Sequence, residues 1–167
     1  MKISLSRSSV LTALTIAILL AALPGAIARL FRTGDPYLLS KQFFEDVLAR
    51  LSGTGRLRFI FQPTVALLIG IRDGIKDSRN GCPPFLLALV SHRARRTDLL
   101  RSALTSVRDL VAAAIILDVI SQFLIFEDVH PGAALVLGPV LIVVPYSISR
   151  ALTNRISRRR NQQLPVI

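Results

Sequence analysis

The sequence predicts an all-α, polytopic membrane protein with three to four transmembrane helices and one amphipathic helix at the membrane interface. Of its 167 residues, 51% are hydrophobic, and the mean hydropathy is +0.54. The hydrophobic residues are gathered into long blocks, which is typical of a chain that has lipid as its solvent. Basic residues flank these blocks and give the chain a net charge of +11.

This positive charge could attract either nucleic acid or an anionic membrane surface. Because the cations flank apolar blocks, we expect anionic lipid head groups to be the partner, and no nucleic acid. Cys82 is the only cysteine, which excludes an internal disulfide and any site with several cysteine ligands. No nucleophile motif, glycine-rich phosphate loop or zinc spacing is present. The sequence therefore predicts no cofactor and no enzyme activity.

Residues 1–31 begin with a basic stretch followed by the apolar block Val10–Leu23. Ala26 and Ala28 then form a small-x-small pattern, which is typical of a signal-peptide cleavage site. Alternatively, the apolar segment extends to Phe31 as an uncleaved anchor that is long enough to span a membrane. Both readings of residues 1–28 stay open, and we favour the anchor.

Residues 32–55 contain an amphipathic helix, expected over Pro36–Leu51. Asp35 suits the N-cap, Pro36 the first helical position and Gly53 the C-cap. The helix is expected either to lie on the membrane interface or to pack on the protein's other helices. Its apolar stripe consists of Leu39, Phe43, Val47 and Leu51, and its polar face of Lys41, Gln42, Glu45, Asp46 and Arg50.

The membrane domain, residues 56–167, begins with a short apolar block. Its uninterrupted part, Phe59–Ile71, has 13 residues, or roughly 20 Å of helix against a hydrocarbon core of about 30 Å. It reaches across if Arg58 and Arg72 extend toward the head groups and the helix continues to Ile75. We expect residues 57–75 to span, and a half-inserted helix is the alternative.

A basic connector over residues 76–101 separates this block from a helical hairpin over residues 106–152. The hairpin helices are expected at Leu110–Phe126 and Ala133–Ile148, joined by a turn with two acids and no Lys or Arg. The positive-inside rule places this turn outside and both basic flanks, with the carboxyl terminus, in the cytoplasm. We expect six flanking arginines to contact anionic lipid: Arg93, Arg95, Arg96, Arg158, Arg159 and Arg160.

Two pairs of short motifs resemble those of a family of small uncharacterised bacterial inner-membrane proteins. They are Arg58-Phe-Ile-Phe-Gln-Pro63 with Gly70-Ile-Arg-Asp-Gly74, and Pro131-Gly-Ala-Ala-Leu135 with Val144-Pro-Tyr146. The resemblance covers about residues 56–156 and implies a membrane hairpin without an assigned activity. That family's last helix ends Arg-Gly-Pro-x-Asn-Arg, whereas here Ala-Leu-Thr follows Arg150, so the helix is expected to run on.

Asp118 is the principal candidate for a functional residue, because a carboxylate near the middle of a membrane helix costs about 2.5–3.5 kcal/mol. Ser121 and Gln122 lie on the same helical face and form a polar site with it. The site is either an interhelical hydrogen-bond cluster, which we favour, or a proton relay or ion site. The first reading predicts that Asp118→Asn is tolerated and that Asp118→Leu harms folding.

Asp109 and Arg150 are expected at the same level of the hairpin, where they would form an ion pair at the cytoplasmic rim, with Tyr146 close enough to hydrogen-bond it. Asp73 and Asp77 lack the spacing of a calcium loop and suit an exposed helix end.

These features together predict a non-enzymatic accessory or assembly subunit of a complex in the bacterial cytoplasmic membrane. The alternative is a small oligomeric transporter or ion-conducting protein that uses Asp118. For the first function we expect a protein partner or a homo-oligomer, with contacts through Leu39, Phe43 and Val47.

Overall fold

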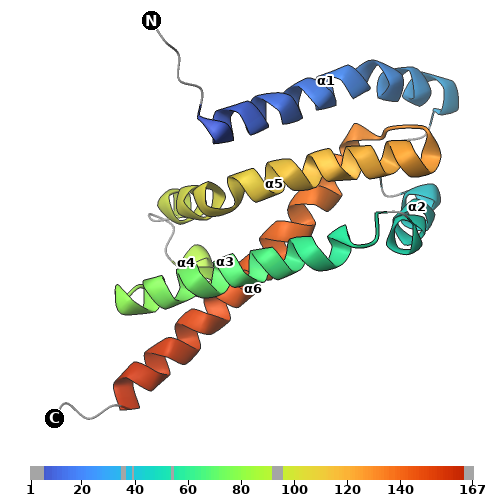
Figure 1. Cartoon of the computed structure of the whole chain (residues 1–167). Coiled ribbons are helices and arrows are strands. Elements are labelled where there is room, and N and C mark those ends of the chain that lie inside the picture. Colours follow the sequence, from blue (N-terminus) through green and yellow to red (C-terminus); the bar gives the residue numbers. More distant parts are fainter. Residues whose placement is uncertain (1–5, 35–36, 39, 54, 92–95, 164–167) are drawn as a thin grey trace, which may run out of the picture. The chain divides into compact units, whose positions relative to one another are not determined.

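The computed structural model describes residues 6–34, 37–38, 40–53, 55–91 and 96–163. Within these residues the chain forms helices and no strands (Figure 1). The helices are α1 (Arg7–Thr33), α2 (Lys41–Ser52), α3 (Arg58–Arg79), α4 (Phe85–Ser91), α5 (Arg96–Phe126) and α6 (Pro131–Gln163). The predicted all-α class is confirmed.

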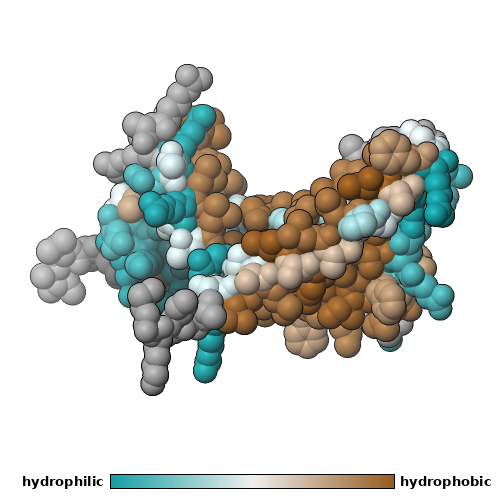
Figure 2. All heavy atoms as spheres, turned by 90° about the horizontal axis from the view of Figure 1, so that it is seen from above, coloured by the Kyte–Doolittle hydropathy of each residue, from teal (hydrophilic) through white to brown (hydrophobic). Residues whose placement is uncertain are grey.

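Among the described residues, three helices are long and apolar enough to cross a membrane: α1, α5 and the Pro131–Arg160 part of α6. Large hydrophobic side chains remain exposed on all three, as a lipid-facing surface requires. Hydrophobic residues likewise cover a large part of the surface seen in Figure 2. Helix α3, which corresponds to the short apolar block, is not among the three.

Helix α1 is continuous over 27 residues, with Pro24 inside it. The Oγ of Ser6 accepts a hydrogen bond from the backbone N–H of Ser9, which caps the start of the helix. Gly34 ends the helix with φ 72°, a left-handed conformation that glycine adopts without a Cβ clash.

Helix α2, which corresponds to the expected amphipathic helix, begins at Lys41, so the expected start at Pro36 is wrong. The Oγ of Ser40 accepts from the backbone N–H of Phe43 at 3.2 Å, which makes Ser40 the N-cap. Asp35 and Pro36 lie outside the described residues. The expected C-cap at Gly53 is confirmed, because its N–H donates to the Ala49 carbonyl at 2.9 Å.

Helices α5 and α6 extend beyond the apolar blocks that predicted them. α5 has 31 residues and begins at Arg96, and α6 has 33 residues and continues to Gln163. The polar ends stay helical because Arg, Leu and Ala have high helix propensity. The connector also contains the helix α4, in which the N–H of Ala88 donates to the carbonyl of Pro84. Pro84 therefore immediately precedes the first helical residue, Phe85, and its carbonyl accepts the first hydrogen bond of α4.

The chain divides into two compact units, each described by itself. Unit 1 comprises residues 1–61 and 109–141, and unit 2 comprises residues 62–108 and 142–167. In unit 1, α1 lies beside α5 and runs in the same direction (Figure 1). Thr15 Oγ1 lies 3.5 Å from the Ala112 carbonyl, and Arg29 near the end of α1 pairs with Asp128 in the turn after α5.

In unit 2, α3 packs against α6 through a stripe of small residues. Gly70 and Gly74 are one turn apart, and a Cβ on either would collide with backbone atoms of α6. Ala66 and Ser78 continue the stripe at the same spacing and are buried. Small residues spaced by four allow two helices to approach at backbone distance.

Candidate functional site

The centre of unit 1 holds a buried ion cluster around Asp118 of α5. Arg50 of α2 places Nη1 3.5 Å from Asp118 Oδ2, and both side chains are fully buried. Arg58, the first residue of α3, forms a second ion pair with Asp118. Gln122 donates from Nε2 to Asp118 Oδ2 at 2.7 Å. One carboxylate therefore joins three helices.

Helix α2 presents a mixed face to this cluster. Phe43 and Arg50 are buried, whereas Phe44, Leu48 and Leu51 are 56%, 65% and 44% exposed. The expected assignment of Arg50 to an outer polar face is therefore wrong. Because Phe43 is only 4% exposed and packs edge-on against Tyr37 of the same chain, its expected contact with another chain is also wrong. Leu39 lies outside the described residues, and Val47 is half-buried.

Tyr37 connects the cluster to a second carboxylate. Arg50 Nη2 donates to the Tyr37 hydroxyl at 3.1 Å, and that hydroxyl donates to Asp46 Oδ2 at 2.6 Å. Burial, together with the neighbouring Asp46 carboxylate, raises the pKa of Tyr37, so the phenol stays protonated. Two arginines are thus balanced by Asp46 and Asp118, which is the condition for holding charges inside a protein.

Gln122 fixes the hairpin turn to the cluster. Its Oε1 accepts a hydrogen bond from the backbone N–H of His130 at 2.7 Å while its amide nitrogen binds Asp118. Ser121 is buried close to Gly55, where a Cβ would collide with the serine hydroxyl. Within the described residues the Ser121 Oγ has no hydrogen-bond partner. The structure therefore brings together the three residues of the expected polar site, but Ser121 takes part only by packing.

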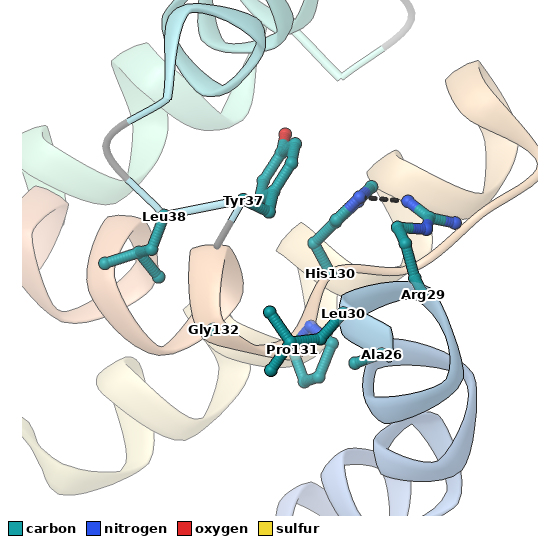
Figure 3. Close-up of a pocket in the computed structure, with 8 residues that line it drawn as sticks. All are labelled: Ala26, Arg29, Leu30, Tyr37, Leu38, His130, Pro131 and Gly132. Carbon is teal, nitrogen blue, oxygen red and sulfur yellow. Dashed lines mark hydrogen bonds between the residues drawn. The ribbon is translucent and has the colours of Figure 1, made fainter. Parts of the chain in front are cut away.

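The turn after α5 forms a second polar group with the end of α1. Arg29 pairs with Asp128 and also contacts His130 Nε2 (Figure 3). The Tyr37 ring stacks on the His130 ring with centroids 3.6 Å apart. Burial and the Arg29 charge lower the pKa of His130 to about 4, so the ring is neutral near pH 7.

Unit 2 contains a separate network around Arg150 of α6. Arg150 binds both carboxylate oxygens of Asp77, at 2.7 and 3.1 Å, and donates from Nη1 to the Tyr146 hydroxyl at 2.8 Å. The Tyr146 hydroxyl donates to Asp73 at 2.8 Å. The expectation that Asp73 and Asp77 suit an exposed helix end is therefore wrong. Their i, i+4 spacing on α3 presents both to α6.

The expected Asp109–Arg150 pair stays a prediction. Within unit 1, Asp109 accepts a hydrogen bond from Ser8. Within unit 2, the guanidinium of Arg150 also stacks over the Phe85 ring, with its central carbon 4.6 Å from the ring centroid.

The expected lipid-binding arginines occupy different environments. Arg96 donates to the backbone carbonyls of Leu89 and Val90 at 2.7 and 2.9 Å, which satisfies the end of α4. Arg158 is half-buried, and Arg159 and Arg160 are exposed. Arg93 and Arg95 lie outside the described residues. Lipid contact by these six arginines stays a prediction.

Sequence reasoning missed Arg50 and Arg58 as partners of Asp118. A helical wheel would have identified Arg50, because it lies seven residues after Phe43 and therefore on the same face. Arg58 carries no comparable signal, since its partner is 60 residues away in sequence.

The ion cluster consists of two arginines that both pair with one carboxylate. Among the described residues, no group of three or more His, Cys, Asp or Glu side chains could hold a metal ion. Its chemistry is that of fixed ion pairs. Comparisons find no matching family model, no matching curated protein and no matching solved structure.

Proposed function

We propose that this chain is a multi-pass protein of the bacterial cytoplasmic membrane that serves as a non-enzymatic accessory or assembly subunit. The observation that carries the proposal is the Arg50–Asp118–Arg58 cluster. Its charged groups bind one another, which favours a role in fixing helices over a role in chemistry. It also orients α2 so that Phe44, Leu48 and Leu51 are exposed and available to a partner helix.

The direction of α1 and α5 supports four membrane crossings. Two parallel helices that both cross a membrane require an odd number of crossings in the segment between them. α3 has 22 residues, about 33 Å, and is the only described helix in that segment longer than 12 residues. Both termini of the chain then lie in the cytoplasm, and the turn after α5 lies outside.

The positive-inside rule alone opposes this topology, because four crossings place the segment from Arg29 to Arg58, with its six cations, outside. The ion pairs of unit 1 weaken the objection. Arg29 is paired with Asp128, and Arg50 and Arg58 are paired with Asp118. Lys41 lies 3.4 Å from Glu45 at the surface. A cation that is paired with a carboxylate adds less net positive charge to the external segment than a free cation, so it opposes this topology less.

The cluster also accounts for the short apolar block of α3. Asp118 lies eight residues before the end of α5, or about 12 Å below it. Since Arg58 binds Asp118 and begins α3, that helix starts well below the outer end of α5. It needs a correspondingly shorter apolar stretch to reach the cytoplasmic side.

A transporter or ion-conducting protein that uses Asp118 is the alternative. It is favoured by several buried polar atoms near the carboxylate, namely Arg58 Nε, Arg58 Nη1 and Ser121 Oγ, which have no hydrogen-bond partner among the described residues. Such atoms could line a hydrated path. Proton or ion flux through proteoliposomes of the purified chain would establish this function, whereas the accessory role predicts no flux.

Single-cysteine labelling tests the proposed topology. In a Cys82→Ala background, a cysteine replacing Arg56 should react with an impermeant maleimide on intact spheroplasts. One replacing Asn80 should react only after permeabilisation. Both parent residues are exposed and flank α3. Labelling of both positions from the same side would show that α3 does not cross the membrane and would contradict the four-crossing topology.

Site-specific photocrosslinking tests the accessory role. A photoreactive residue at Leu48, which is 65% exposed, should crosslink to another membrane protein or a second copy in cells. The same residue at Gln42, also exposed but on the polar side of α2, is the matched control. If Leu48 forms no protein adduct and the chain purifies as a monodisperse monomer in mild detergent, the accessory role is wrong.

A further inference from the structure

In unit 2, side chains of α4 and α6 line a groove of about 400 Å³. This volume lies within the range of clefts that bind small molecules, roughly 300–1,000 Å³. The lining is apolar except for Arg155, whose side chain is exposed. The apolar lining residues are Pro84, Leu86 and Leu87 at the beginning of α4, and Ile148, Ala151 and Leu152 of α6.

The groove side of α4 is as apolar as the side that packs on the protein. Ser91 is the only polar residue among the seven of this helix. Phe85 and Ala88 are buried, whereas Leu86 and Leu87 are 41% and 60% exposed. A helix that is apolar all round belongs in a protein core or in lipid, because water would otherwise cover its outer face. We therefore expect hydrocarbon to occupy the groove.

The positive charge of Arg155 is not neutralised by the protein. Arg150, five residues earlier on α6, pairs with Asp77, whereas Arg155 forms no ion pair with another described residue. From Ala151 to Arg160 the helix carries four arginines and no acidic residue, and α4 carries none either. An unpaired guanidinium beside an apolar groove complements a ligand in which a phosphate is joined to hydrocarbon.

The groove follows α6 from its apolar block into its basic flank. Ile148 is the last residue of the apolar block, and Arg155 lies seven residues further along, or about 10 Å. The head-group layer on each side of a bilayer is about 5–8 Å thick, and an arginine side chain can extend toward it. Acyl chains would therefore lie at the level of Ile148 and phosphates within reach of Arg155.

We propose that this groove binds one anionic phospholipid of the cytoplasmic leaflet. Its phosphate pairs with Arg155, and one of its acyl chains packs on Leu86, Leu87 and Leu152. The proposal rests on the membrane insertion and topology proposed above. It differs from a general attraction of basic flanks to anionic lipid, because the apolar groove holds a single lipid molecule beside one arginine.

Native mass spectrometry of the full-length chain in neutral detergent tests the role of Arg155. The probes are phosphatidylglycerol, which carries one net negative charge, and phosphatidylcholine with the same acyl chains, which carries none. Arg155→Gln should lower retention of phosphatidylglycerol about fivefold, because one arginine–phosphate contact is lost. Retention of phosphatidylcholine should stay as it is. Inorganic phosphate at millimolar concentration should not displace the lipid, because phosphate leaves the apolar groove unfilled.

Arg79→Gln is the matched control for the change in net charge. Arg79 is the last residue of α3, is exposed and does not line the groove. Because this variant loses the same charge, it should retain phosphatidylglycerol like the wild-type chain. Circular dichroism of both variants checks the fold.

Fluorescence quenching tests where the acyl chain lies. The chain contains no tryptophan, so a single introduced tryptophan reports on its own surroundings. Phosphatidylglycerol with brominated acyl chains should quench Leu87→Trp and saturate at about one lipid per chain. Leu68→Trp is the control, because Leu68 of α3 is 61% exposed and lies outside the groove. Its quenching should rise in proportion to the brominated lipid in the micelle.

Equal loss of phosphatidylglycerol in Arg155→Gln and Arg79→Gln would overturn the site, since overall charge would then explain the binding. Quenching of Leu87→Trp without saturation, or displacement of the lipid by phosphate, would overturn it as well. A photoreactive residue at Leu87 that crosslinks to another protein in cells would assign the groove to a partner helix instead. These outcomes leave the proposed membrane topology intact, whereas recovery of the chain in the soluble fraction without detergent would overturn the membrane insertion itself.

Discussion

Arg50 and Asp118 face each other at 3.5 Å across 68 residues of sequence, and neither side chain is exposed. Arg50 belongs to a helix of only 12 residues, and Asp118 to one of 31 residues. The pair therefore fixes the short helix α2 to the long helix α5. Since Arg58 binds the same carboxylate, the start of α3 is held at the same point, and the stability of unit 1 should depend strongly on Asp118.

We expect Asp118→Asn to destabilise the protein by about 3–5 kcal/mol, because it removes the carboxylate that both buried guanidinium groups contact and leaves only Asp46, reached through Tyr37, as a counter-charge. This reverses the expectation from sequence that the amide is tolerated, which considered only the hydrogen bond to Gln122. The measurement is thermal or denaturant unfolding in detergent. The double variant Asp118→Asn, Arg58→Met should recover part of the loss. If Asp118→Asn unfolds like the wild-type chain, the ion cluster does not stabilise the fold.

Removing one arginine should have a smaller effect than removing the shared carboxylate. In Arg58→Met, Arg50 still neutralises Asp118, and the apolar side chain fills part of the vacated space. The same holds for Arg50→Met, although its hydrogen bond to Tyr37 is also lost. We expect each single variant to be more stable than Asp118→Asn. The double variant Arg50→Met, Arg58→Met should lose more unfolding free energy than the two single variants lose together. Simple additivity would mean that the two arginines act independently.

The helical class could be predicted from sequence because hydrophobic blocks of membrane length have few alternatives. Boundaries such as Lys41 and Arg96 were missed, because caps and charged helix ends carry weaker signals than apolar blocks. Asp118 was identified because a carboxylate in an apolar block is costly wherever it lies. Its arginine partners were not, because Arg50 was read as part of a solvated face and Arg58 as a flank of the next block.

The same reasoning explains why the network around Arg150 was missed. Asp73 and Asp77 lie within a run of mixed charge, which most often marks an exposed helix end. Only the approach of α3 to α6 at Gly70 and Gly74 brings these carboxylates to Tyr146 and Arg150. That approach depends on tertiary packing.

Acid should destabilise the fold through His130. Its pKa is about 4 in the folded chain, against 6.5 for an ordinary histidine, because burial and Arg29 disfavour the charged ring. Between these pH values the unfolded chain binds more protons than the folded one, so stability falls as the pH decreases from about 6.5 to about 4. His130→Asn should remove this part of the pH dependence. Unfolding midpoints at pH 7.5 and 5 measure it, and identical slopes for both chains would contradict it.

The packing of α3 on α6 can be tested by two equivalent substitutions of helical glycines. Gly70→Ala adds a Cβ that collides with Ser149 and the Tyr146 carbonyl of α6. Gly25→Ala adds one in α1 where no atom lies within 4 Å. Alanine is favoured over glycine in a helix by about 1 kcal/mol, so Gly25→Ala should be neutral or stabilising.

Gly70→Ala should instead destabilise by about 1–3 kcal/mol, because the helices must separate to admit the methyl group. Separation would also stretch the hydrogen bond from Tyr146 to Asp73, now 2.8 Å long, and the pair between Arg150 and Asp77, now 2.7 Å. Asp77→Asn in the Gly70→Ala background should then cost less than in the wild-type chain. Unfolding of the four proteins in one detergent gives the coupling. Equal costs in the two backgrounds would mean that the glycine contact and the Arg150 network are independent.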